Sequence, residues 1–137
     1  MKIYNYQLET LATYLHSLKL ERKASRLRTR FKNIILEKFQ TVLNEVNEIN
    51  KEYLIFDENN QPLLKDDKYL FKDDVKRLND INELYKESFI IEQNENNREM
   101  LESIKDSVTN HSPLSFEGSD ADIYDGICEL VEQIEYE

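Results

Sequence analysis

Apolar residues recur at steps of three and four over most of the chain, which is the spacing of a helix with one buried face. The longest such run extends from about residue 20 to residue 52 and contains no glycine or proline. It predicts one long amphipathic helix. A shorter run from Leu8 to Leu18 predicts a first helix, with Asn5 as its N-cap.

The pattern changes after the long helix. Residues 53–56 (YLIF) and 69–71 (YLF) are short apolar runs, and residues 57–60 (DENN) are typical of a turn. The two runs therefore predict a small β hairpin. Residues 89–91 (FII) predict a third short strand.

Three further helices are predicted. Acidic side chains favour the start of a helix, so Asp73 and Asp74 predict one there. Its buried face should hold Val75, Leu78, Ile81, Leu84 and Tyr85. Another helix should start near Asn96. The last should follow Gly118, where Ser119 and Asp122 resemble a capping box.

These elements predict a mainly α, α+β fold, in which one long amphipathic helix is joined by three or four shorter helices and a small β hairpin or sheet. No linker or internal repeat divides residues 1–137, and the length is typical of one domain. We therefore expect a single domain.

The composition narrows the cellular setting. A single cysteine, Cys128, excludes an internal disulfide and suits a reducing compartment. The first residues lack the apolar run of a signal peptide, and no segment reaches the roughly 18 apolar residues that a membrane span needs. We expect a cytoplasmic protein that does not contact a membrane.

Charge is distributed unevenly along the chain. The formal net charge is -10, yet residues 1–38 carry nine basic and three acidic side chains, a net charge of +6. No lysine or arginine follows Lys105. Because nucleic-acid-binding proteins are usually basic overall, we expect no direct sequence-specific contact with nucleic acid. The acidic surface could also serve only solubility.

The basic residues of the long helix share one face. On a helical wheel, an arc of about 100° contains Lys19, Arg22, Lys23, Arg26 and Arg30. This basic stripe could bind phosphates or an acidic protein surface, with Arg22, Arg26 and Arg30 as the candidate contacts. It could equally pair with the acidic C-terminal helix of the same chain. Arg28 and Lys32 border the apolar face, where we expect them to pair with acids inside the fold.

The C-terminal helix carries a row of carboxylates. The candidate partner-binding residues are Asp120, Asp122, Asp125, Glu129 and Glu132. Such a row can imitate the phosphates of DNA and occupy a basic nucleic-acid channel. The alternative is an ordinary solvated helix face.

Catalytic and metal-binding patterns are weak. Residues 120–126 loosely resemble a calcium-binding loop, but the third acid and the glycine each fall one position late. The two histidines, His16 and His111, have no catalytic motif around them or around Cys128. We expect no enzyme, no cofactor and no metal.

Residues 18–31 (LKLERKASRLRTRF) are the most distinctive segment. Together with the order of the later segments along the chain, which include residues 123–125 (IYD) and 128–129 (CE), they resemble a small domain-of-unknown-function family of phages and prophages of Gram-positive bacteria. The resemblance covers most of the chain. It implies a small, stand-alone phage protein and brings no established activity.

Two hypotheses follow. In the first, the protein is a phage accessory protein that binds and inhibits a host factor in the host cytoplasm, such as a defence nuclease of the CRISPR kind. In the second, it is a virion- or tail-associated structural or assembly protein, whose long helix forms part of an oligomer interface. The partner is then a host protein, a phage protein or a second copy of the chain. An enzyme would instead need a deep pocket that holds Cys128 and a histidine together.

Overall fold

A computed structural model describes all 137 residues. It is mainly helical, and its helices are α1 Leu8–Ser17, α2 Arg22–Glu52, α3 Asp74–Lys86, α4 Glu95–His111 and α5 Ser119–Glu132. Two small antiparallel sheets complete it, β1 Lys2–Tyr4 with β4 Ser88–Ile90 and β2 Leu64–Lys65 with β3 Lys68–Tyr69. The predicted α+β, mainly α fold with one long helix is confirmed. No helix is long and apolar enough to cross a membrane.

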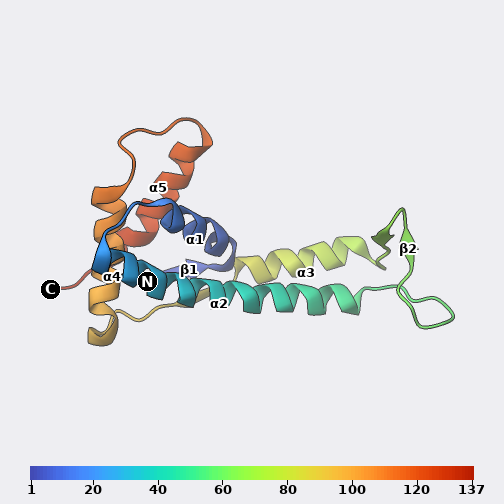
Figure 1. Cartoon of the computed structure of the whole chain (residues 1–137). Coiled ribbons are helices and arrows are strands. Elements are labelled where there is room, and N and C mark those ends of the chain that lie inside the picture. The colour runs from blue at the N-terminus through green and yellow to red at the C-terminus, as the bar shows by residue number, and fades with distance from the viewer.

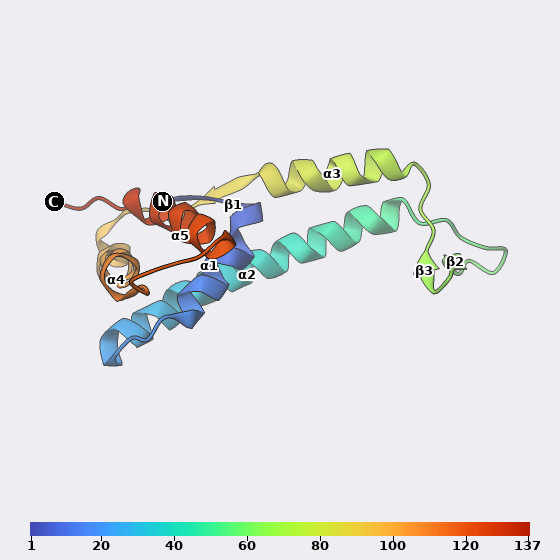
Figure 2. The same cartoon turned by 90° about the horizontal axis from the view of Figure 1, so that it is seen from above.

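The molecule has a head and an arm (Figure 1). The head contains α1, α4, α5, the β1–β4 sheet and the N-terminal half of α2. The arm consists of α3 packed antiparallel on the C-terminal half of α2, and it ends in a tip formed by residues 53–73 (Figure 2). One helix, α2, therefore runs through both parts and fixes their relative direction.

The apolar face of α2 forms the centre of the core of the head. Leu27, Phe31 and Ile35 are buried at steps of four, and α1 and α4 pack against them. Leu15 of α1 and Ile104 of α4 are completely buried in the same core. Burying a side chain of this size contributes roughly 1.5–3 kcal/mol, so each of these residues stabilises the head.

The β1–β4 pair connects the arm to the head. Ile3 lies opposite Phe89, which confirms the strand predicted near residues 89–91. Its partner strand was not predicted. Asn5 was expected to cap the first helix, and this was wrong, because α1 begins at Leu8 after a short 3-10 turn, η1 Asn5–Gln7. The Asn5 side chain is instead buried and donates a 2.8 Å hydrogen bond to the carbonyl of Leu84.

The predicted hairpin strands are only partly correct. Residues 53–56 and 69–71 form isolated bridges, Leu54 with Phe71 and Phe56 with Pro62. The regular pairing lies between them, where β2 and β3 flank the turn at residues 66–67. Both turn residues have positive φ, 54° and 62°, as in a type I′ turn, which favours the twist of a hairpin.

α3 starts where it was predicted, and Asp73 is its N-cap, but its buried face differs from the prediction. The Asp73 side chain accepts a hydrogen bond from the backbone N–H of Lys76. Val75 and Leu78 are exposed, whereas Leu84 is buried. α3 packs against α2 and, near its C-terminal end, against η1, so the apolar side chains near its N-terminal end are left exposed.

The last two helices differ at their starts. The helix α4 starts close to residue 96, where it was predicted. Asn94 is its N-cap, and the side chain of Asn94 accepts a 2.9 Å hydrogen bond from the N–H of Asn97. For α5 the predicted capping box is absent, because Gly118 occupies the N-cap and no side chain bonds there.

Candidate functional site

Four carboxylates form one face of α5. Asp122, Asp125, Glu129 and Glu132 are all exposed, and on an ideal helix they fall within an arc of about 80°. They span about 15 Å along the axis at a rise of 1.5 Å per residue. None of them takes part in an ion pair. We call these four residues the acidic face.

The opposite side of α5 is apolar, and this orients the acidic face outward. Ile127, Leu130 and Val131 are buried in the head core, where α5 packs on α4. The apolar and acidic residues of α5 alternate along the sequence in such a way that they fall on opposite sides of the helix. Packing the apolar side into the core therefore leaves the acidic face exposed. The fifth predicted acid, Asp120, does not join the acidic face. It lines a cavity of about 540 Å³ with Tyr14 and other residues at the start of α5.

An aromatic cluster anchors the start of α5. The rings of Phe116 and Tyr124 stack with their centroids 4.4 Å apart. The phenol of Tyr14 donates a 2.7 Å hydrogen bond to the hydroxyl of Ser112. Burial raises the pKa of Tyr14, and the hydrogen bond shared with Cys128 raises that of Tyr124. The rings of Tyr14 and Tyr124 also lie with their centroids 6.1 Å apart, so the cluster holds α5 against α1.

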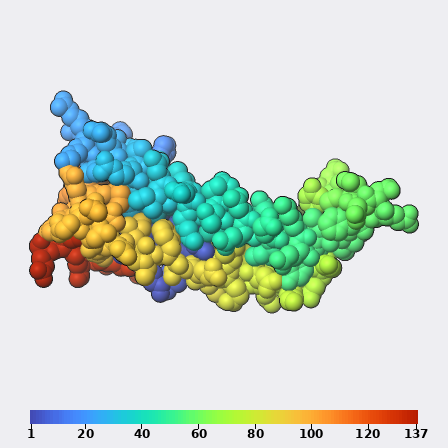
Figure 3. Space-filling model, turned by 90° about the horizontal axis from the view of Figure 1, so that it is seen from below, coloured from blue at the N-terminus to red at the C-terminus, as the bar shows by residue number.

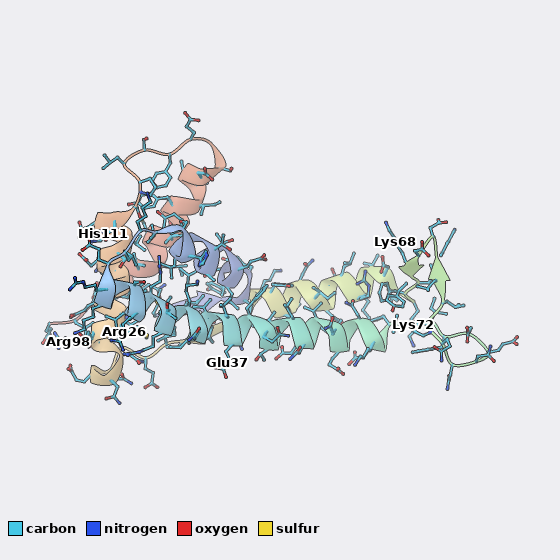
Figure 4. All side chains as sticks on the ribbon, in the orientation of Figure 1. Arg26, Glu37, Lys68, Lys72, Arg98 and His111 are labelled. Atoms are coloured by element: carbon cyan, nitrogen blue, oxygen red, sulfur yellow. The ribbon has the colours of Figure 1, made fainter.

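The basic stripe lies on an exposed face of α2, in the head. Arg22, Arg26 and Arg30 are exposed and form no ion pair; Arg26 is labelled in Figure 4. Lys23 pairs with Glu99 of α4. The pKa of Glu99 is lowered, first by the hydrogen bond from Lys23 and then by the charges of Lys23 and Arg30. The stripe thus borders α4, and no ion pair joins it to α5.

Two other cations of α2 contact α1, and the prediction that they pair with acids was wrong. The guanidinium of Arg28 donates to the carbonyls of Leu15 and Leu18, at the C-terminal end of α1. The ammonium of Lys32 lies 2.7 Å from Nδ1 of His16. Carbonyls at the end of a helix lack partners within it, so Arg28 supplies donors that the helix itself cannot.

A second row of carboxylates lies in the arm, and the sequence interpretation missed it. A groove of about 380 Å³ between α2 and α3 is lined by Glu45, Glu48, Glu52, Asp80, Glu83 and Glu87, together with Ile49 and Leu84. Lys51 and Lys86 each pair with one of these acids at the exposed edge. The spacing of acids at three and four on each helix was visible in the sequence. Only the antiparallel packing of α3 on α2 brings the two rows together.

The two histidines and the cysteine each contact different residues. His16 contacts Lys32, whereas Nε2 of His111 lies 3.6 Å from a carboxylate oxygen of Asp106. Cys128 is half-buried beside Tyr124. Five surface cavities of about 220–540 Å³ are lined by none of these histidine or cysteine side chains. No cluster of three or more His, Cys, Asp or Glu side chains is arranged to hold a metal ion.

The chain was compared with known proteins at three levels. No protein-family model, no curated protein and no solved structure matches it. The resemblance to the phage family therefore stays a prediction.

Proposed function

We propose that this protein is a non-enzymatic phage accessory protein that binds and inhibits a host factor through the acidic face of α5. The partner surface is basic and ordinarily binds nucleic acid, as in a defence nuclease. The proposal rests on one observation, the row of four exposed and unpaired carboxylates on α5.

The spacing of the carboxylates supports this choice of partner. Successive acids on the face are three or four residues apart, which is about 4.5–6 Å along a helix axis. A cationic channel built for a polyanion can contact several of them at once. Because the chain has a net charge of -10, long-range attraction also favours approach to a basic surface and is weakened by salt.

The basic stripe gives a second contact of opposite sign. Arg22, Arg26 and Arg30 have no partner within the chain, so they are available to carboxylates beside the basic channel. An interface with both signs of charge selects one partner orientation, because rotating the molecule would oppose like charges. In this proposal the protein acts in the host cytoplasm and does not bind nucleic acid directly.

The test neutralises the acidic face without changing its shape. The variant carries Asp122→Asn, Asp125→Asn, Glu129→Gln and Glu132→Gln. A matched control carries Glu45→Gln, Glu48→Gln, Glu52→Gln and Glu83→Gln in the groove of the arm, so both variants lose four negative charges. Tagged proteins are used to capture partners from a lysate of the bacterial host, and bound proteins are released with duplex DNA.

We expect the unaltered chain and the arm control to retain a nucleic-acid-binding protein that DNA displaces. The variant of the acidic face should bind it at least tenfold more weakly, because it loses several charge-assisted contacts. Binding should also weaken as salt rises. Equal binding by both four-site variants would contradict the proposal, since only net charge would then matter.

A virion- or tail-associated assembly role is the second candidate. The arm favours it, because a two-helix projection that ends in an exposed hairpin is suited to reach between neighbouring subunits (Figure 3). Recovery of the protein in purified phage particles, and not in complexes with a host nucleic-acid-binding protein, would support this candidate over inhibition.

A further inference from the structure

One glycine of α5 is not required by the fold. Gly126 lies in the interior of the helix, where glycine is less favourable than alanine, and its φ is not positive. A Cβ added at this position meets no atom within 4 Å, so no neighbouring segment of the chain requires the absence of a side chain. Glycine allows another molecule to come close to a backbone. Gly126 therefore marks a surface that a partner can approach closely.

That surface is hollowed. Gly126 lines a cavity of about 220 Å³ between α5 and the N-terminal end of α1, and these two helices lie side by side in the head (Figure 1 and Figure 2). Ile123 and Leu130 of α5 supply apolar walls, and Tyr6 of η1 contributes an aromatic ring. Most small-molecule sites have volumes of roughly 300–1,000 Å³, so this cavity is better matched to one side chain of a partner protein.

Tyr6 is an exposed aromatic ring with a fixed position. Its side chain is 58% exposed, and its ring stacks on that of Tyr4 with the centroids 5.5 Å apart. The ammonium of Lys2 lies 4.9 Å from the ring centre of Tyr4, whereas no cation of the chain lies over Tyr6. An exposed aromatic ring attracts a cation to its face, and most often the cation is a guanidinium. Tyr6 is available for such a contact.

The charge around the cavity has one sign. Asp122 lines the cavity, and two further cavities of about 330 and 540 Å³ continue along α1, with Ile123 common to all three. The acids of the two further cavities are Glu9, Glu117 and Asp120. None of the four carboxylates forms an ion pair, and no lysine or arginine lines any of the three cavities. The groove is therefore complementary to a basic partner.

We propose that the cavity beside Gly126 is a pocket for an arginine side chain of the partner protein. The guanidinium pairs with Asp122 and stacks on Tyr6. The aliphatic stem of the arginine lies against Ile123 and Leu130. This inference rests on the proposed function, because Asp122 also belongs to the acidic face and the same basic partner contacts both surfaces. It adds the kind of residue that anchors that partner.

The walls select arginine over other side chains. An apolar side chain in the cavity would take water from Asp122 without giving it a partner, which costs free energy. A lysine has an apolar stem, but its ammonium neither stacks flat on a ring nor presents a fork to a carboxylate. The missing side chain of Gly126 lets the stem of the arginine pass close to the backbone of α5.

The first experiment titrates the full chain with the isolated side chain and follows the backbone amides by NMR. The probe is acetyl-arginine amide, and its control is acetyl-citrulline amide, which has nearly the same shape without the charge. We expect saturable shifts at Gly126 and Thr10, with a dissociation constant of about 1–10 mM. The citrulline probe should bind at least tenfold more weakly, because it cannot pair with Asp122. Equal binding of the two probes, or no shift at Gly126, would overturn the proposal.

A second experiment locates the pocket with two substitutions, each with a matched control. Gly126→Leu fills the cavity, whereas Ala121→Leu places the same side chain on an exposed part of α5 that lines none of the three cavities. Asp122→Asn removes the carboxylate, whereas Glu37→Gln removes the same charge from an exposed and unpaired position of α2. We expect the first variant of each pair to bind the arginine probe at least fivefold more weakly, and the controls to bind it as the unaltered chain does.

Stability separates lost binding from lost folding. Because leucine favours a helix more than glycine does, Gly126→Leu should melt at the same temperature as the unaltered chain or higher while it binds the probe more weakly. Unchanged binding by Gly126→Leu or by Asp122→Asn would refute the pocket. Gly126→Leu keeps all four carboxylates of the acidic face, so the two proposals can fail separately. If the probe binds as expected but the acidic-face variant and its arm control capture the same proteins equally, the proposed function is wrong and the arginine pocket stands.

Discussion

The phenol of Tyr53 donates a 2.5 Å hydrogen bond to Oδ2 of Asp80. Tyr53 is the first residue after α2, and Asp80 lies in the middle of α3, so this bond joins the two helices near the outer end of the arm. The hydrogen bond to Asp80 is the largest cause that raises the pKa of Tyr53 from 10.0 to about 12. Burial and the negative charge of Asp80 act in the same direction.

We predict that the arm loses stability in alkaline solution because of this bond. The pKa of Tyr53 is higher in the folded protein than in the unfolded chain, so folding favours the neutral phenol. The contribution is complete below the ordinary pKa of 10.0 and disappears as the pH rises through about 12. Unfolding of the unaltered chain and of Tyr53→Phe, measured by denaturant over this range, should show a smaller pH dependence in the variant.

Asp80→Asn is the control for the titration. It keeps the shape of the side chain but removes the charge, so the pKa of Tyr53 should fall toward its ordinary value. Tyrosinate absorbance of this variant, compared with that of Tyr53→Phe in the same background, isolates the one phenol among eight tyrosines. A Tyr53 pKa that does not move would show that Asp80 is not the cause.

The sequence predicted the parts of the fold that depend on local periodicity. The long helix ends at Glu52 as expected, because its apolar residues keep one face over eight turns without a breaker. What it missed depends on packing between distant segments. β1 is a strand because β4 lies beside it, and Val75 is exposed although the helical spacing placed it on the buried face of α3.

In the candidate site, too, the sequence revealed what local periodicity determines and missed what the packing of distant segments determines. The sequence indicated the acidic face because four acids repeat along one helix, whereas Asp120, predicted with them, lies on another side of α5. The groove of the arm was missed, because its acids belong to two helices whose pairing the sequence does not reveal. Whether the basic stripe faces outward was also open, and the exposure of Arg26 answers it.

A second prediction concerns the junction between arm and tip. The guanidinium of Arg77 stacks 4.0 Å from the ring centre of Phe71 and donates 2.8 Å hydrogen bonds to Asn50 and Asp74. Its side chain is only 14% exposed. We expect Arg77→Ala to destabilise the tip by about 1–2 kcal/mol, because a stacked cation and two charged hydrogen bonds are lost.

Hydrogen exchange measures this local effect. The N–H groups of Ile55, Leu63 and Lys72 bond within the tip, and they should exchange roughly 5–30 times faster in the variant. Lys76→Ala, on the neighbouring exposed residue, removes a cation that makes no such contact and should leave exchange unchanged. Equal exchange in both variants would show that Arg77 does not hold the tip.

The two glycines of α5 should respond in opposite directions to alanine. Gly118, at the N-cap, has φ 54° and ψ -127°, which side chains rarely tolerate, whereas Gly126 lies inside the helix. A Cβ added at either position meets no atom within 4 Å, so backbone conformation alone decides the result. Gly118→Ala should cost about 1–3 kcal/mol through strain, and Gly126→Ala should gain about 0.5–1 kcal/mol through helix propensity. Thermal unfolding of the two variants measures both effects, and a stabilising Gly118→Ala would mean that α5 starts in a different conformation.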